Sequence, residues 1–173
     1  MSVTFLGTPI ELSGALPKQG EIGPSFTLCD QSLSDIGPEH FAGKKLVLNI
    51  FPSVDTPTCA NSVRTFNELA EGLNNTVVLC VSADLPFALS RFVENHELRH
   101  VSVASFFRSP TFALDHGVAI SGGVLKGLAS RAVIVLDEDR TVLHSQLVNE
   151  IADEPNYQQV IAAVKGASLQ YTF

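Results

Sequence analysis

The chain has 173 residues, of which 45% are hydrophobic and 17% charged, and its net charge is −7. These values are typical of one globular domain, expected here over residues 1–173, and they exclude a disordered chain. The acidic balance disfavours a general surface for nucleic acid or anionic membranes. The N-terminus lacks a basic region followed by an apolar run, and no apolar stretch is long enough to span a bilayer, so we expect a cytoplasmic protein without a membrane partner.

The N-terminal part of the chain predicts a hairpin and little other regular structure. Residues 3–6 and 10–12 flank a Gly-Thr-Pro turn, which predicts a β-hairpin within residues 1–14. Residues 25–29 fit a short strand, and residues 31–43 are irregular, with room for one helical turn.

A strand–helix–strand unit follows. The near-continuous apolar runs over residues 45–51 (KLVLNIF) and 76–82 (TVVLCVS) are typical of buried strands. Between them, a stripe of apolar residues at helical spacing predicts one amphipathic helix: Val63, Phe66, Ala70 and Leu73. A βαβ unit of this kind almost always crosses over right-handed.

The next stretch predicts a helix over 85–95 capped by Asp84, followed by an ambiguous segment over 101–105 and a helical segment over 110–116. The last part of the chain predicts a hairpin of strands 131–136 and 141–147, and then a helix over 154–165. The tail over 166–173 has no predicted structure. A βαβ half followed by a ββα half is the thioredoxin arrangement, in which helices cover both faces of a mixed sheet. We therefore predict an α/β, thioredoxin-like fold.

One cysteine lies where a reactive thiol is expected. In the stretch FPSVDTPTCANSVR, Thr56 can cap a helix through its hydroxyl, and Pro57 suits the first helical position. Cys59 then falls in the first turn, where unpaired backbone N–H groups and the positive end of the helix dipole favour a thiolate. Because the thiolate is the nucleophilic form of cysteine, this position predicts a reactive Cys59.

The other two cysteines predict packing rather than chemistry. Cys80 lies inside an apolar strand, and Cys29 follows an apolar segment near a strand end. Three cysteines at irregular spacing do not form a disulfide framework, and no C-x-x-C pair indicates zinc or a dithiol site.

A short motif offers a different reading. His96 and His100 fit the H-E-x-x-H pattern of zinc hydrolases. Such a site needs both histidines on one helix face, a third ligand and a dry cleft. The surrounding polar residues predict instead a solvated helix end, so we expect no metal.

The segment around Cys59 resembles a known family. PSVDTPTC matches the P-x-x-x-[TS]-x-x-C signature of peroxiredoxins. Further stretches are similar to the bacterial thiol peroxidase subfamily: LNIFPSVDTPTCANSVRTFN, NTVVLCVSADLPFALSRF, GLASRAVIVLDE, HSQLVNEI and EPNY. The similarity extends from the N-terminal hairpin to the last helix, and together these stretches are far more specific than the eight-residue signature.

The resemblance implies roles for four residues. Cys59 resembles the peroxidatic cysteine, whose thiolate attacks a hydroperoxide and becomes a sulfenic acid. Thr56 resembles the hydroxyl that hydrogen-bonds thiolate and peroxide, Arg131 the arginine that steadies the thiolate and polarises the peroxide, and Pro52 the residue that shields the pocket from water. Arg64, on the same predicted helix, either adds positive potential or is solvated. The family also implies a homodimer, thioredoxin or another thiol as reductant, and no bound cofactor.

The sequence departs from the family at the resolving position. The family pattern S-R-F-C reads SRFV here, so that Val93 stands where a second cysteine would form a disulfide with Cys59. The chain is then a natural one-cysteine variant, a protein in which Cys29 or Cys80 resolves, or an engineered Cys→Val form. The alternative function is a redox sensor or binding protein that signals by disulfide exchange through Cys59.

Overall fold

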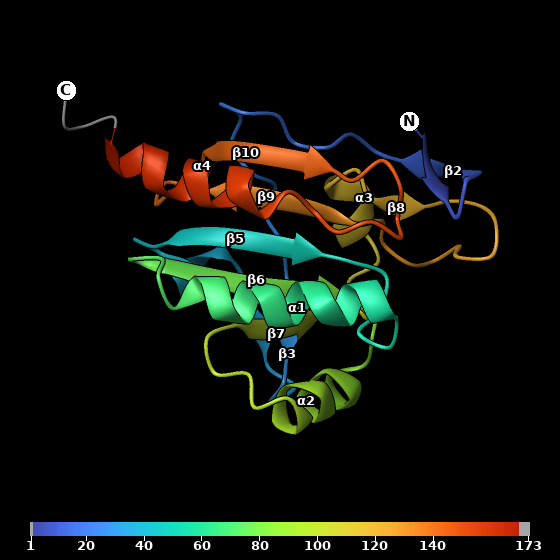
Figure 1. Ribbon diagram of the computed structural model, residues 1–173, viewed down its shortest axis with the longest axis horizontal. Helices are drawn as coiled ribbons and strands as arrows, with labels where there is room; N and C mark the ends of the chain where they lie inside the picture. The colour runs from blue at the N-terminus through green and yellow to red at the C-terminus, as the bar shows by residue number, and fades with distance from the viewer. Residues whose placement is uncertain (1, 170–173) are drawn as a thin grey trace.

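The computed structural model describes residues 2–169, in which two sheets form (Figure 1). The larger sheet has seven strands in the order β10-β9-β5-β6-β7-β3-β4. Their bounds are β3 Leu28–Asp30, β4 Asp35–Ile36, β5 Lys45–Ile50, β6 Thr76–Ser82, β7 Ser102–Ser105, β9 Ala132–Leu136 and β10 Val142–Leu147. β5, β6 and β7 are parallel to one another, whereas β9 is antiparallel to β5 and β10 to β9, so the sheet is mixed as predicted.

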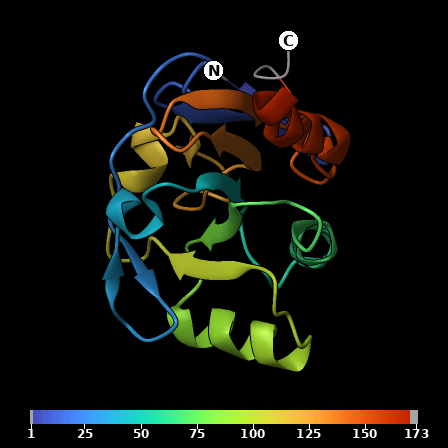
Figure 2. The same ribbon diagram turned by 90° about the vertical axis from the view of Figure 1, so that its left-hand side faces the viewer.

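Helices cover both faces of this sheet. Three helices pack on one face: α1 (Pro57–Ala70), α2 (Pro86–Asn95) and α4 (Tyr157–Leu169). The short α3 (Phe112–Asp115) packs on the other face, and Figure 2 shows it on the opposite side of the strands from α1 and α4. The predicted thioredoxin-like arrangement is therefore confirmed.

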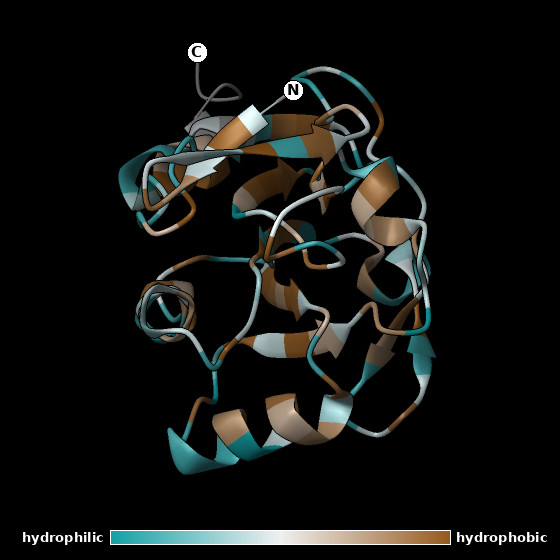
Figure 3. Cartoon of the chain, turned by 90° about the vertical axis from the view of Figure 1, so that its right-hand side faces the viewer, coloured by the Kyte–Doolittle hydropathy of each residue, from teal (hydrophilic) through white to brown (hydrophobic). Residues whose placement is uncertain are grey.

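The alternation of side chains along the strands explains the two layers. Along β5, Val47 packs against the three-helix face, whereas Leu46, Leu48 and Ile50 pack toward α3. Every residue of β5 is buried, as expected for a central strand covered on both sides. Figure 3 shows hydrophobic residues concentrated on these central strands.

The N-terminal hairpin is confirmed and belongs to a second sheet. β1 (Ser2–Phe5) pairs with β2 (Thr8–Ser13), and β2 pairs with a two-residue strand, β8 (Ala119–Ile120). The side chains of Val3 and Ile10 pack with Ile151, which lies between β10 and α4. The hairpin therefore contacts the segment that follows β10.

The other predictions are partly correct. The ambiguous segment is β7, and a 3-10 helix over Pro38–Phe41 supplies the helical turn. The closing helix starts and ends later than predicted, so the tail is helical to Leu169, and residues 170–173 lie outside the described part. Within residues 2–169, no helix has both the length and the apolar character needed to cross a membrane.

Candidate active site

The sheet brings together two segments that are far apart in the sequence. Ile50, the last residue of β5, pairs with Ala132, the first residue of the antiparallel β9. The loop that begins after β5 and Arg131 therefore lie at the same edge of the sheet. α1 starts at that edge, with Pro57 in its first turn as predicted.

Cys59 and Arg131 are in direct contact at this edge. The guanidinium Nη2 of Arg131 donates a hydrogen bond to Cys59 Sγ over 3.1 Å, and its Nε donates to the Ile151 carbonyl over 3.0 Å. Cys59 is 0% and Arg131 1% exposed. The predicted pairing of cysteine and arginine is thus present in the geometry.

Arg131 is a buried cation whose side-chain partner at this contact is the sulfur of Cys59. A buried cation is costly unless a partner balances it. Among the ion pairs of the described residues, none involves Arg131. Cys59 Sγ is the side-chain atom that accepts from this guanidinium, and a hydrogen bond from a cation is strongest when its acceptor is ionised.

One amino group of Arg131 has no partner. In the described residues, the buried Nη1 makes no hydrogen bond. A buried donor without an acceptor is rare in native structures and needs an explanation. Nη1 belongs to the same guanidinium as Nη2, which contacts the sulfur, so an acceptor bound there would lie within the same planar group.

Thr56 caps α1 differently from our prediction. It is the N-cap residue with an extended backbone, but its hydroxyl makes no capping hydrogen bond. The Oγ1 atom instead donates to the Ser53 carbonyl over 3.0 Å. The hydroxyl therefore donates its hydrogen bond within the loop, and this bond does not involve the lone pairs of Oγ1. Thr56 is exposed and Pro52 buried, so that the loop has one residue at the surface and one against the core.

Asp84 is not the helix cap that we predicted, because Leu85 is the N-cap of α2. Its carboxylate lies across the sheet edge and accepts from the Ser53 hydroxyl over 2.7 Å, the Val54 amide over 2.9 Å and the Ser82 hydroxyl over 2.6 Å. It therefore anchors the loop that carries Pro52 and Thr56. The carboxyl ends of adjacent parallel strands meet at one edge, so an acid directly after β6 was the available signal for this contact.

A buried polar contact that the sequence analysis missed supports the first turn of α1. Asn49 Nδ2 donates to Ser62 Oγ over 3.3 Å, and Ser62 Oγ donates to the Cys59 carbonyl over 3.1 Å. Asn49 is fully buried in β5. A polar residue in an otherwise apolar strand was the only sequence signal for it.

The other residues considered in the sequence analysis, Arg64 and the two histidines of the H-E-x-x-H segment, are not part of the contact between Cys59 and Arg131. Arg64 is exposed and its guanidinium binds the Asn61 side chain rather than the cysteine. The H-E-x-x-H segment is not helical, because α2 ends at Asn95 and Glu97 has a φ of 51°. His96 packs on the ring of Phe92, with centroids 4.4 Å apart.

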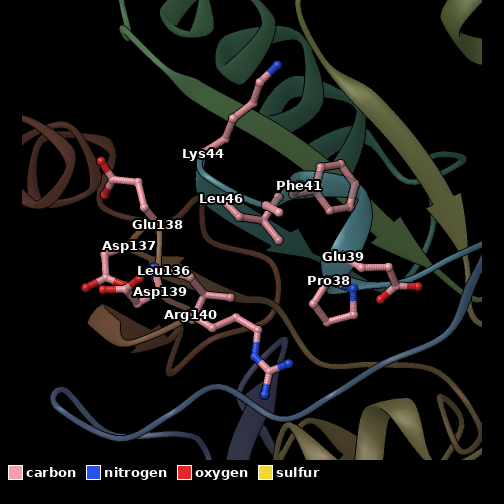
Figure 4. A pocket seen from close by; sticks show the side chains of 11 residues that line it. Pro38, Glu39, Phe41, Lys44, Leu46, Leu136, Asp137, Glu138, Asp139 and Arg140 are labelled. Atoms are coloured by element: carbon pink, nitrogen blue, oxygen red, sulfur yellow. Dashed lines mark hydrogen bonds between the residues drawn. The ribbon is translucent and has the colours of Figure 1, made fainter.

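Two cavities can be compared with this geometry. One of about 350 Å³ lies between the start of α1 and α2 and includes Thr56, Pro57 and Arg91 in its lining. Another of about 300 Å³ is lined by Phe41, Leu46 and the turn after β9 (Figure 4). Leu46 pairs with Leu136 at the opposite end of β5 from Pro52, so the second cavity is remote from Cys59.

Comparisons with known proteins agree with this geometry. Residues 18–161 match the Redoxin family. A thiol peroxidase of Vibrio cholerae serotype O1 is 51% identical over 164 residues, which cover 95% of this chain and 100% of that protein.

Solved structures give the same result. A peroxiredoxin-like protein from Aquifex aeolicus superposes with a TM-score of 0.88 at 37% identity, covering 95% of this chain and 96% of that one. A thiol peroxidase from Chromobacterium violaceum has the same fold, with a TM-score of 0.91 at 22% identity over 98% of both chains. The chain therefore belongs to the Redoxin family, and within it to the thiol peroxidases, a branch of the peroxiredoxins.

Proposed function

We propose that the protein is a thiol-dependent peroxidase in which the Cys59 thiolate reduces hydrogen peroxide and alkyl hydroperoxides. The observation that carries this proposal is the 3.1 Å contact between Cys59 Sγ and a buried arginine that has no carboxylate partner among the described residues. The thiol peroxidases that the chain resembles support the same chemistry.

The reaction follows from the groups at the site. The sulfur lone pair attacks the nearer oxygen of ROOH, the S–O bond forms and the O–O bond breaks, so that sulfur is oxidised by two electrons and the peroxide is reduced. The products are a sulfenic acid, which keeps the peroxide proton, and RO⁻, which takes a proton from water to become ROH. In this proposal, Nη1 of Arg131, which has no hydrogen-bond partner among the described residues, stabilises the negative charge on the leaving oxygen.

The loop residues contribute to binding. The Thr56 hydroxyl donates a hydrogen bond to the Ser53 carbonyl, so the lone pairs of Oγ1 can accept a hydrogen bond from the hydroperoxide O–H. Pro52 is buried and offers no N–H, which suits a residue that keeps water from the sulfur.

An external thiol best explains how the sulfenic acid is resolved. Burial raises the pKa of the Cys80 thiol to about 12, so the nucleophilic thiolate of Cys80 is scarce at neutral pH. Cys29 lies in β3, which is separated from β6 by β7, whereas Cys59 lies in α1, which contacts β6, and a disulfide needs Cα atoms within about 7 Å. A thiol R′SH would form a mixed disulfide with Cys59 and release water, and a second R′SH would then regenerate Cys59.

The remaining features of the proposal concern the setting of this reaction. Thioredoxin or a similar dithiol is the reductant, and the protein needs no bound cofactor. We also propose a homodimer and a cytoplasmic location, where the three free cysteines would stay reduced.

Turnover with peroxide tests the proposal. The wild-type protein with thioredoxin, its reductase and NADPH should consume hydrogen peroxide or cumene hydroperoxide continuously, and Cys59→Ser should abolish consumption. Cys80→Ser is the matched control, because it removes a buried thiol from the neighbouring strand, and it should retain turnover. Activity that survives in Cys59→Ser would refute the assignment, and oxidation limited to a single turnover with every thiol offered would favour the sensor.

A further inference from the structure

The Glu150 carboxylate connects the N-terminal hairpin to the segment after β10. Its Oε1 accepts hydrogen bonds from the Gly7 amide over 2.9 Å and the Thr4 hydroxyl over 3.0 Å. Its Oε2 accepts from the Leu6 amide over 3.1 Å and the Ala152 amide over 2.8 Å. Three of these four donors come from the hairpin, one from β1 and two from its turn, more than 140 residues away in the sequence.

The residues next to Glu150 contact the active site. The Ile151 carbonyl accepts from Arg131 Nε over 3.0 Å, and the Ala152 carbonyl accepts from the Thr58 hydroxyl over 2.9 Å. The Ile151 amide donates to the Thr4 carbonyl over 2.8 Å, so the hairpin holds this segment through main chain and side chain together. Figure 1 shows β2 and β8 at the same end of the molecule as the tip of β5 and the start of α1.

This arrangement controls the direction of the Arg131 guanidinium. The group is planar and rigid, so fixing Nε also fixes where Nη1 and Nη2 point. Nε has the Ile151 carbonyl as its acceptor, and Nη2 has Cys59 Sγ. A displacement of the Ile151 carbonyl would therefore turn the guanidinium away from the sulfur.

We propose that Glu150 is a positioning residue, which holds Arg131 on Cys59 by fixing the Ile151 carbonyl, and that the N-terminal hairpin is thereby part of the active-site scaffold. This inference rests on the roles proposed above for Cys59 and Arg131. The four donors also hold the pKa of the Glu150 carboxyl at about 2, below its usual 4.5, so the carboxylate stays charged wherever the enzyme works.

Replacement of Glu150 by glutamine tests the proposal. Glutamine keeps the shape but offers one acceptor oxygen instead of two, so that the Leu6 and Ala152 amides or the Gly7 and Thr4 donors lose their partner. We expect the midpoint of the Cys59 thiolate titration to move to higher pH. It is read from absorbance at 240 nm as the difference between each variant and its Cys59→Ser counterpart. Oxidation of Cys59 by peroxide should slow by roughly tenfold. This effect lies between the one expected for the loss of one hydrogen bond and the one expected for a displacement of a catalytic group by about 1 Å.

Asp137→Asn is the matched control. The Asp137 carboxylate also accepts two backbone amides, from Asp139 and Thr141, but at the far end of β9 from Arg131. Both amides bind Oδ1, the oxygen that asparagine keeps, so this variant removes one negative charge as Glu150→Gln does and should leave the thiolate titration in place. Glu150→Gln could instead lower the melting temperature and leave both the titration and the oxidation rate unchanged. That result would show that Glu150 only stabilises the attachment of the hairpin, and it would overturn the proposal.

A milder variant covers the case in which Glu150→Gln does not fold. Thr4→Val removes one of the four donors and should move the titration in the same direction by a smaller amount; no movement would overturn the proposal. The titration needs no peroxide. A wild-type protein that forms the Cys59 thiolate but does not reduce peroxide would therefore refute the proposed function while the role of Glu150 is still measured.

Discussion

Arg131 is 1% exposed, and an unbalanced cation at such a position costs several kcal/mol. A protein that only needed to fill this volume would be as stable, or more stable, with an apolar side chain there. The retained charge supports the role proposed above for Arg131, which is to stabilise the thiolate before the reaction and the leaving oxygen during it.

Replacement of Arg131 by alanine should slow the oxidation of Cys59 by roughly 10²- to 10³-fold, the usual effect of removing one preorganised donor from a developing anion. Stopped-flow measurement with hydrogen peroxide gives the rate constant. Arg64→Ala is the control, because Arg64 lies on the same helix as Cys59 but binds Asn61 at the surface, and its rate should match the wild type. A rate for Arg131→Ala within twofold of the wild type would contradict the role of the guanidinium.

The lowered pKa of the Glu150 carboxyl predicts that the protein loses stability in acid. Its pKa is lowered from 4.5 to about 2, mainly by the Ala152 and Gly7 amides, so the folded state binds this proton less readily than the unfolded state. The resulting stabilisation is complete above about pH 4.5 and disappears as the pH falls toward 2. Urea unfolding of the wild type and Glu150→Gln between pH 6 and pH 3 should therefore show a difference in free energy that shrinks with acidity. A constant difference over this range would mean that charge is not the source of the stabilisation.

α2 carries the departure from the family pattern. Val93 is partly buried and packs against the apolar cluster that contains Cys59. α2 has only ten residues, of which Pro86, Leu89 and Phe92 are buried, and a helix of this length has little stability without its packing. The stability of α2 therefore depends on the packing of these three residues on the sheet.

Val93→Cys should restore internal resolution. One equivalent of peroxide should produce a disulfide between Cys59 and the introduced cysteine, detected by non-reducing peptide mapping. Glu94→Cys is the matched control, since the neighbouring side chain is exposed and should give no such bond. The wild type should give a sulfenic acid or a mixed disulfide with the added thiol. A wild-type disulfide to Cys29 or Cys80 would instead identify an internal resolver.

The elements that the sequence predicts best are those whose pattern is local. The apolar runs of β5 and β6 and the stripe on α1 fix the βαβ unit, and Pro57 fixes where α1 begins. The short strands β3, β4 and β8 were missed or only suggested, because two or three residues carry no periodicity.

The contacts between side chains were harder to predict than the elements. The hydroxyl of Thr56 and the carboxylate of Asp84 both had a possible local partner at a helix start, and both bind the Ser53–Val54 loop instead. The nearness of Arg131 to Cys59 depends on β9 pairing with β5, which no local pattern encodes. Only the family resemblance singled out Arg131, and nothing in the sequence singled out Glu150.

At the scale of the whole molecule, the active site is held by two acids outside it. Asp84 fixes the loop that carries Pro52 and Thr56 to the end of β6, and Glu150 fixes the acceptor of Arg131 to the N-terminal hairpin. The nucleophile is on α1, between the two anchored segments. Three parts of the fold that are distant in sequence therefore determine the geometry around one sulfur atom.

Exposed apolar side chains gather on connected elements around α2, which gives the proposed homodimer a defined face. The four residues are Leu33, which is 46% exposed, Leu85 (51%), Phe87 (68%) and Phe107 (45%). Hydrogen bonds join their elements, from Gln31 to Ser90 and from Arg108 to the Leu33 carbonyl. Apolar patches of this kind mark association sites, and a stable interface buries on the order of 1,600 Å² in total.

Phe87→Glu should therefore shift the protein from dimer to monomer, because it places a charge in the centre of the buried face. Sedimentation velocity over a range of protein concentrations measures the change. Val124→Glu is the matched control, since Val124 is 88% exposed in the loop between β8 and β9, and it should leave the dimer intact. A monomeric wild type, or a dimer lost in Val124→Glu and kept in Phe87→Glu, would show that the α2 face is not the interface.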